Sequence, residues 1–122
     1  MIGKICTFHM PYYDIKSRKM LIKARPALVI GYADKTDLTV LPVSKVSDQR
    51  RIHPKYDIKV DPSLYPKSNL SCVSYIRTHK VYTVNSQELN VIVCDLKAEY
   101  DEIYLRALCL FEEYTKKLLE QI

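Results

Sequence analysis

The chain has 122 residues, of which 48% are hydrophobic and 27% are charged, and its formal net charge is +5. This length supports one core of ordinary size, so we expect a single domain over residues 1–122. With only two glycines, the sequence contains neither a P-loop nor a dinucleotide-binding loop. The longest apolar stretch, residues 27–33, is far below the roughly 18 residues that span a bilayer. The first residues show no signal-peptide pattern, and we therefore expect a cytoplasmic protein.

Charge is distributed unevenly along the chain. Residues 1–94 hold 15 Lys and Arg against 7 Asp and Glu, whereas residues 95–122 hold 4 against 7. This asymmetry predicts a basic body that can meet phosphates and an acidic C-terminal segment held away from them. Many basic proteins bind no nucleic acid, so charge alone does not assign a function.

The cysteines indicate neither a disulfide framework nor a zinc site. Cys6, Cys72, Cys94 and Cys109 are widely scattered and form no Cys-x-x-Cys pair. We expect reduced, mostly buried thiols that act as small hydrophobic residues. A catalytic Cys-His pair is the alternative, and no spacing in the sequence supports it.

The first half of the chain predicts strands separated by polar segments. A strand is expected from Lys4 to Pro11, and the cationic stretch 14–23 is expected to be a mobile loop. The apolar run 27–32 is typical of a strand buried on both faces. Turn residues at 34–37 and a second apolar run at 38–43 predict its antiparallel partner in a hairpin.

The second half predicts further strands and then a helix. Alternation over 56–60 and over 70–80 predicts two half-buried strands, residues 86–89 a short helical turn, and residues 91–94 a last strand. From Asp95 onwards, apolar residues recur at helical spacing, which predicts a helix with one face on the core. Part of that helix serving as a partner-binding surface is the alternative. Short strands followed by one helix indicate a mainly β fold with α: a small antiparallel β-barrel with a C-terminal helix.

Four short segments add a more specific signal than composition. They are Gly3-Lys4-Ile5, Arg25-Pro26-Ala27-Leu28-Val29-Ile30, Leu41-Pro42-Val43-Ser44 and Tyr75-Ile76-Arg77-Thr78. Their order, with a polar stretch after the first and a helix at the end, resembles that of the MazF/PemK-type toxin ribonucleases of type II toxin-antitoxin systems. The resemblance covers nearly the whole chain and rests on the joint order of these segments.

The resemblance implies both an architecture and an activity. The fold would be an SH3-like barrel, usually a homodimer, that cleaves single-stranded RNA at short preferred sequences without a metal or other cofactor. A cognate antitoxin protein would cover the RNA site. The implied reaction is attack of the ribose 2′-hydroxyl on the adjacent phosphate, leaving a 2′,3′-cyclic phosphate and a 5′-hydroxyl. Such a reaction needs a base, an acid and cations that stabilise the dianionic transition state.

Three residues match the family's catalytic positions. Arg25 matches its essential arginine, Ser44 a hydroxyl residue that is commonly Thr, and Arg77 the arginine of an Arg-Thr motif. Arginine stays protonated at neutral pH, so we expect Arg25 and Arg77 to clamp the phosphate. Ser44 would hydrogen-bond a phosphoryl oxygen or the 2′-hydroxyl. The simpler interpretation is a solvated arginine at a strand end and a serine that caps a turn.

The expected general base is missing from the sequence. Some family members carry an Asp two residues after the Arg-Thr pair, whereas here Thr78 is followed by His79 and Lys80. Strand alternation places His79 on the face of Arg77, and an imidazole is suited to proton transfer near neutral pH. A merely exposed or stacked histidine is the alternative.

Two basic segments are candidate RNA contacts. The candidate residues are Lys16, Arg18 and Lys19 before the second strand and Thr78, His79 and Lys80 after the Arg-Thr arginine. Tyr12 and Tyr13 lie beside the first group and are suited to stack on bases. A solvated charged loop is the alternative.

Two non-enzymatic functions compete with the ribonuclease. One is a gyrase poison of the CcdB type, which acts through a terminal Trp-Gly-Ile; this chain has no Trp and ends Glu120-Gln121-Ile122. The other is a catalytically degenerate barrel that binds RNA or protein without cleavage.

Overall fold

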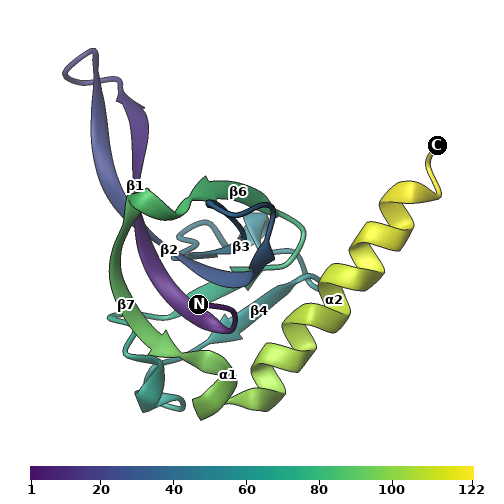
Figure 1. The fold of residues 1–122 in the computed structure, drawn as a ribbon. Coiled ribbons are helices and arrows are strands. Elements are labelled where there is room, and N and C mark those ends of the chain that lie inside the picture. Colours follow the sequence, from purple (N-terminus) through teal and green to yellow (C-terminus); the bar gives the residue numbers. More distant parts are fainter.

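Seven antiparallel strands form one sheet that curls into a half-barrel (Figure 1). The computed structural model covers residues 1–122. The strands are β1 (Lys4–Asp14), β2 (Lys19–Tyr32), β3 (Asp37–Ser44), β4 (Asp57–Val60), β5 (Ser74–Arg77), β6 (Tyr82–Asn85) and β7 (Leu89–Asp95). Their order across the sheet is β4-β5-β3-β2-β1-β7, and β6 pairs with β3. The predicted mainly β fold with a C-terminal helix is confirmed.

The hairpin predicted around residues 34–37 is present. β2 and β3 pair in antiparallel fashion, with Leu28 opposite Leu41 and Ala27 opposite Pro42. In the turn, the Asp34 carboxylate accepts hydrogen bonds from the backbone N–H groups of Thr36 and Asp37, each at 2.8 Å. This is the local chemistry for which aspartate is favoured in turns.

The cationic stretch 14–23, expected to be a mobile loop, is instead the end of a long β-hairpin. Tyr12 lies opposite Leu21 and Tyr13 opposite Met20, and such cross-strand pairs stabilise extended backbone. Pro11 does not stop the strand, because β1 pairs with β7 only as far as Phe8 and the proline lies on a free edge. We call residues 9–24 the arm, which projects from the barrel in Figure 1.

The predicted strand over 70–80 is shorter than expected. Only Ser74–Arg77 forms β5, because Thr78 turns aside: its N–H and its hydroxyl both donate to the Tyr56 carbonyl, at 3.1 and 2.6 Å. β6, which was not predicted, follows at Tyr82–Asn85. The strands expected at 56–60 and 91–94 are present as β4 and β7, and residues 86–88 form the expected helical turn.

The core consists of two apolar clusters, one on each side of the curled sheet. Successive side chains of β1 and β2 point to opposite faces, so Ile5 and Leu28 enter one cluster and Phe8 and Val29 the other. The first cluster also contains residues from the start of the C-terminal helix: Ile103, Tyr104 and Ala107. The second is closed by Val84 of β6. All four cysteines are free; Cys6 and Cys94 are buried as expected, but Cys109 is exposed.

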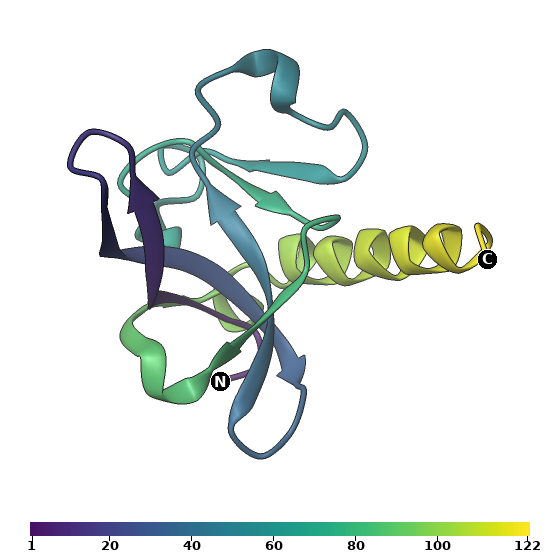
Figure 2. The same cartoon turned by 90° about the horizontal axis from the view of Figure 1, so that it is seen from above.

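The C-terminal helix is interrupted where a continuous one was expected. Asp95 caps α1 (Leu96–Glu99) by accepting from the Ala98 N–H at 3.2 Å, and α2 (Asp101–Leu119) begins after a break at Tyr100. The Tyr100 hydroxyl accepts from the Lys67 N–H at 3.0 Å and its ring packs edge-on against Tyr65, which holds this residue outside helical geometry. The start of α2 packs on the core as predicted, and its end runs outward (Figure 2). Neither helix combines the length and apolarity that crossing a membrane requires.

Gly3 links the N-terminus to α1, because its carbonyl accepts a hydrogen bond from the Lys97 N–H at 3.0 Å. Its backbone has a conformation that residues with a side chain adopt at an energetic cost. Its φ is +91°, and a Cβ there would lie 2.5 Å from the Lys97 Cβ. We expect Gly3→Ala to lower the free energy of unfolding by about 1–3 kcal/mol. Gly31→Ala is the matched control, because its Cβ would meet nothing within 4 Å. Urea unfolding of both variants checks this, and equal midpoints would contradict the assignment of strain to Gly3.

Candidate active site

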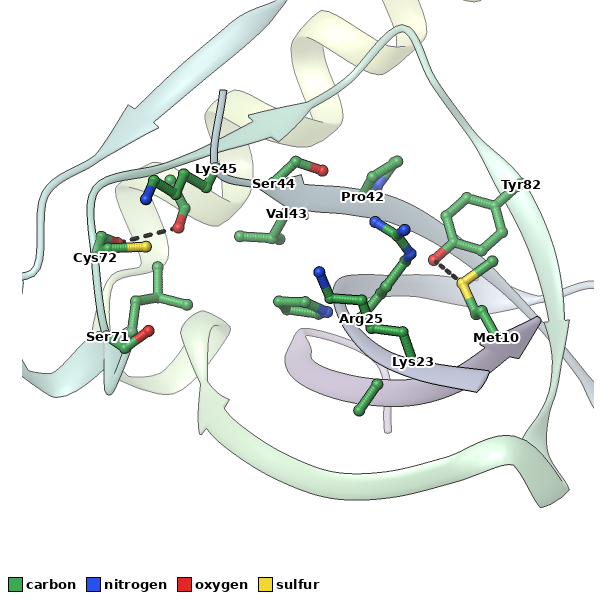
Figure 3. Close-up of a pocket in the computed structure, with 14 residues that line it drawn as sticks. Met10, Lys23, Arg25, Pro42, Val43, Ser44, Lys45, Ser71, Cys72 and Tyr82 are labelled. Atoms are coloured by element: carbon green, nitrogen blue, oxygen red, sulfur yellow. Dashed lines mark hydrogen bonds between the residues drawn. The ribbon is translucent and has the colours of Figure 1, made fainter. Parts of the chain in front are cut away.

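A pocket of ≈ 550 Å³ opens where β3 separates from β2 (Figure 3). The pairing of β2 with β3 begins only at Ala27, opposite Pro42. The residues of β2 before Ala27 therefore have a free edge on this side, and that edge forms one wall of the pocket. The end of β3, the segment 70–74 and Tyr82 form the others. The lining residues are Met10, Lys23, Ala24, Arg25, Pro26, Pro42, Val43, Ser44, Lys45, Leu70, Ser71, Cys72, Ser74 and Tyr82.

Arg25 and Ser44 line this pocket together. Arg25 lies in β2 opposite Phe8, and its guanidinium carbon is 5.8 Å from the centre of the Tyr12 ring. None of the ion pairs in the structure involves Arg25. Ser44 is the last residue of β3, opposite Tyr75. The structure therefore brings together two of the three predicted catalytic residues, and the arginine is free to bind an anion.

The pocket is electropositive. Lys23 and Lys45 line it beside Arg25, and its lining contains no Asp, Glu or His. A phosphate placed here would meet three cations and no carboxylate. Such an arrangement stabilises the negative charge that accumulates on a phosphoryl group during cleavage.

Arg77 lies in a different cluster. Its Nε and one terminal nitrogen donate to the two oxygens of Asp57, each at 3.2 Å, and the same terminal nitrogen donates to the Arg51 carbonyl at 2.9 Å. The Asp57 side chain is fully buried and that of Arg77 is 18% exposed. The register of β4 and β5 sets Arg77 directly opposite Asp57, away from β2. The expected grouping of Arg77 with Arg25 and Ser44 is therefore not formed within one chain.

His79 lies in the same group of side chains around Asp57, which we call the Asp57 cluster. This agrees with its predicted position on the face of Arg77. Its Nδ1 is 3.6 Å from an Asp57 oxygen and is buried without a hydrogen-bond partner. Its ring lies 5.1 Å from that of His53 and 6.3 Å from that of Tyr114 on α2. This is the stacked position named as the alternative, and it lies outside the Arg25 pocket. Burial lowers the pKa of His79, while the Asp57 charge opposes that shift.

The lowered pKa of His79 predicts a pH dependence of stability. Its ordinary value is 6.5. As the pH falls through 6.5, His79 takes up a proton in the unfolded chain before it does so in the folded chain. The contribution of His79 to the free energy of unfolding is therefore fully present above pH 6.5 and decreases as the pH falls toward the pKa of the folded state. We expect His79→Gln to flatten that fall relative to wild type, measured as the urea midpoint between about pH 7 and pH 5. His9→Gln, on an exposed strand residue, is the control; equal slopes for wild type and His79→Gln would contradict the prediction.

The predicted RNA contacts are not all accessible. Lys16, Arg18 and Lys19 are exposed at the end of the arm, and Lys80 is exposed beside a second, basic hollow of ≈ 490 Å³. That hollow is lined by Arg50, Arg51, Ile52, His53, Pro54, Arg77, His79 and Lys80. Thr78 is fully buried, so its position does not support a contact with RNA.

Sequence reasoning missed several residues of the pocket. Tyr82, Met10 and Cys72 line it but belong to none of the matched segments. The sequence contained a signal for the first of them, because Val81-Tyr82-Thr83-Val84 is rich in β-formers. No local signal places Met10 or Cys72 beside Arg25, since both positions depend on how distant strands pair.

The family model described as "PemK-like, MazF-like toxin of type II toxin-antitoxin system" matches residues 5–111. The chain belongs to this family. Toxins of the PemK/MazF family are endoribonucleases, and the matched range contains both the Arg25 pocket and the Asp57 cluster. None of the curated protein sequences matches the chain.

Solved structures show the same fold at low sequence identity. An "Endoribonuclease in complex with its cognate antitoxin from Mycobacterial species" is 12% identical, with a TM-score of 0.62 over 95% of this chain and 94% of that one. The Mycobacterium tuberculosis toxin MazF-mt6 is 16% identical, with a TM-score of 0.59 over 96% of each chain. The PemK/MazF fold is therefore present over almost the whole of this chain.

Proposed function

We propose that this PemK/MazF-family chain is an endoribonuclease toxin that cleaves single-stranded RNA at a preferred sequence, without a metal, by attack of the 2′-hydroxyl. The observation that carries the proposal is the unpaired Arg25 beside Ser44 in a pocket free of carboxylates. Family membership supports it, because toxins of this family act on RNA.

In this mechanism Arg25 holds the scissile phosphate. Its planar guanidinium donates to two phosphoryl oxygens and stabilises the extra charge of the pentacoordinate transition state. Ser44, on the opposite strand, donates a hydrogen bond to a phosphoryl oxygen. Arg77 acts outside this pocket: it holds the loop 48–56 through Asp57 and the Arg51 carbonyl, and so shapes the second basic hollow.

RNA flanking the scissile phosphate lies along the arm and the second hollow. Lys16, Arg18, Lys19 and Lys80 bind backbone phosphates, and Tyr12 offers its ring for stacking beside Arg25. The functional unit is a cytoplasmic homodimer, and a cognate antitoxin silences it by covering the basic pocket. The antitoxin complex of one structural relative supports this last part.

The test is incubation of the purified protein, freed of any antitoxin, with a long unstructured RNA in EDTA. We expect cuts at a recurring short sequence, with 2′,3′-cyclic phosphate on the upstream fragments and 5′-hydroxyl on the downstream ones. Cleavage that stops in EDTA, or fragments that carry a 5′-phosphate, would reject this mechanism.

One observation favours the second candidate, a barrel that binds RNA without cutting it. The pocket holds no imidazole or carboxylate to take the 2′-hydroxyl proton. RNA that stays intact but binds with strong salt dependence would establish this function instead.

A further inference from the structure

Tyr82 projects a fixed hydroxyl group into the Arg25 pocket. It is the first residue of β6, paired with Val40, and its ring packs against the cluster that contains Val84. Its hydroxyl donates to the Met10 Sδ at 3.4 Å, as the dashed line in Figure 3 shows. A thioether sulfur is a weak hydrogen-bond acceptor, so the Tyr82 hydroxyl can turn its hydrogen bond toward a stronger acceptor that enters the pocket. Figure 3 also shows the Arg25 guanidinium extending toward Tyr82.

The proposed reaction needs a proton donor that the assigned residues do not supply. When the P–O5′ bond breaks, the leaving oxygen becomes an alkoxide unless it is protonated in the same step. A guanidinium and a serine hydroxyl are both poor proton donors, so Arg25 and Ser44 do not fill this role. Lys23 and Lys45 are exposed, whereas the ring of Tyr82 packs against the core. The pocket's other acidic side chain, Cys72, lies on the wall away from Arg25 in Figure 3, so Tyr82 is the better-positioned acid.

We propose that Tyr82 is the general acid of the cleavage reaction, an assignment that rests on the proposed ribonuclease function. As the 2′-oxygen forms its bond to phosphorus, its proton passes to solvent water. The P–O5′ bond breaks, and the proton on the Tyr82 Oη moves to O5′ to give the 5′-hydroxyl. The tyrosinate left behind is stabilised by Arg25 and regains a proton from solvent.

The surroundings of the Tyr82 hydroxyl act on its proton in two opposite ways. Burial raises the pKa of Tyr82 above its ordinary value, and the charge of Arg25 acts in the opposite direction. The hydroxyl is consequently protonated at neutral pH, as an acid must be. The charge of Arg25 offsets part of the cost that burial adds to the ionised form.

The test compares Tyr82→Phe with wild type on two RNA substrates. One is an ordinary oligonucleotide that contains the cleavage sequence; the other carries sulfur in place of O5′ at the scissile bond. A thiolate leaves without protonation, so it needs no general acid. We expect Tyr82→Phe to cleave the ordinary RNA about 10²–10⁴-fold more slowly and the sulfur-bridged RNA at a near wild-type rate. Tyr32→Phe, at the exposed far end of β2, is the matched control.

The outcomes separate this proposal from the one on which it rests. Equal slowing on both substrates, or slowing on neither, overturns the role of Tyr82 while leaving the ribonuclease function in place. Wild-type protein that cleaves neither substrate overturns both. Thermal unfolding of Tyr82→Phe shows whether the fold is intact; a variant that retains its Tm yet loses only the ordinary substrate supports the assignment.

Discussion

Arg25→Ala is expected to slow RNA cleavage by about 10²–10³-fold, the usual cost of removing one donor that stabilises a transition-state anion. Arg25 is exposed and forms no ion pair, so its removal leaves the free energy of unfolding nearly unchanged. Arg25→Lys retains the charge but not the two parallel hydrogen bonds, and we expect an intermediate rate. Single-turnover cleavage of a short RNA measures all three proteins.

Arg106→Ala is the matched control for this experiment. Arg106 is also exposed, but it lies on α2 outside the pocket, so the same loss of one positive charge should leave cleavage unchanged. If both arginine variants lose activity equally, net charge rather than the position of Arg25 governs cleavage. If neither loses activity, the pocket lined by Arg25 and Ser44 is not the active site.

Asp57→Ala is expected to lower the free energy of unfolding by about 3–5 kcal/mol, because it leaves a largely buried arginine without its counter-ion. The Asp57 carboxylate binds Arg77 through both oxygens and also accepts from the His53 N–H at 2.8 Å. Urea unfolding measures the loss. Glu112→Ala removes an exposed ion pair to Lys116 on α2 and should leave the urea midpoint nearly unchanged.

A double-mutant cycle separates the ion pair from other effects of the Asp57 substitution. With Arg77→Met in the same protein, the orphaned charge is gone, and Asp57→Ala should cost much less than it does alone. If the two substitutions add without coupling, the cost arises from the lost backbone hydrogen bond and not from the pair. Near wild-type stability of Asp57→Ala would contradict the buried-pair interpretation altogether.

The apolar strands were predictable because their hydrophobic pattern depends on burial alone. Residues 27–29 and most of 38–43 are buried from one hairpin, but the burial expected over all of 27–32 was wrong at its end, where Tyr32 is 56% exposed. The arm was not predictable in the same way. Both of its edges and most of its side chains face solvent, so polar residues such as Lys16 and Lys19 are compatible with either strand or loop.

The active-site prediction had a similar limit. Arg25 and Ser44 line one pocket because β2 and β3 are neighbours along the chain and diverge there. The position of Arg77 depends instead on the β4-β5 register, which sets it opposite Asp57. No local pattern contains that information. The strand that carries Tyr82 had a local signal, but its position beside the pocket did not, since β6 joins the sheet beside β3 rather than beside its nearest strand in sequence.

The arm beyond Phe8 is paired only with itself, whereas Arg25 lies at the point where the arm meets the barrel. The barrel's core therefore gains little from the arm's side chains, and the arm's length and composition can change at low cost to folding. Under the proposed ribonuclease function, a protein built in this way can acquire a new RNA target sequence by altering the arm, while the proposed catalytic arginine, Arg25, stays on a rigid base.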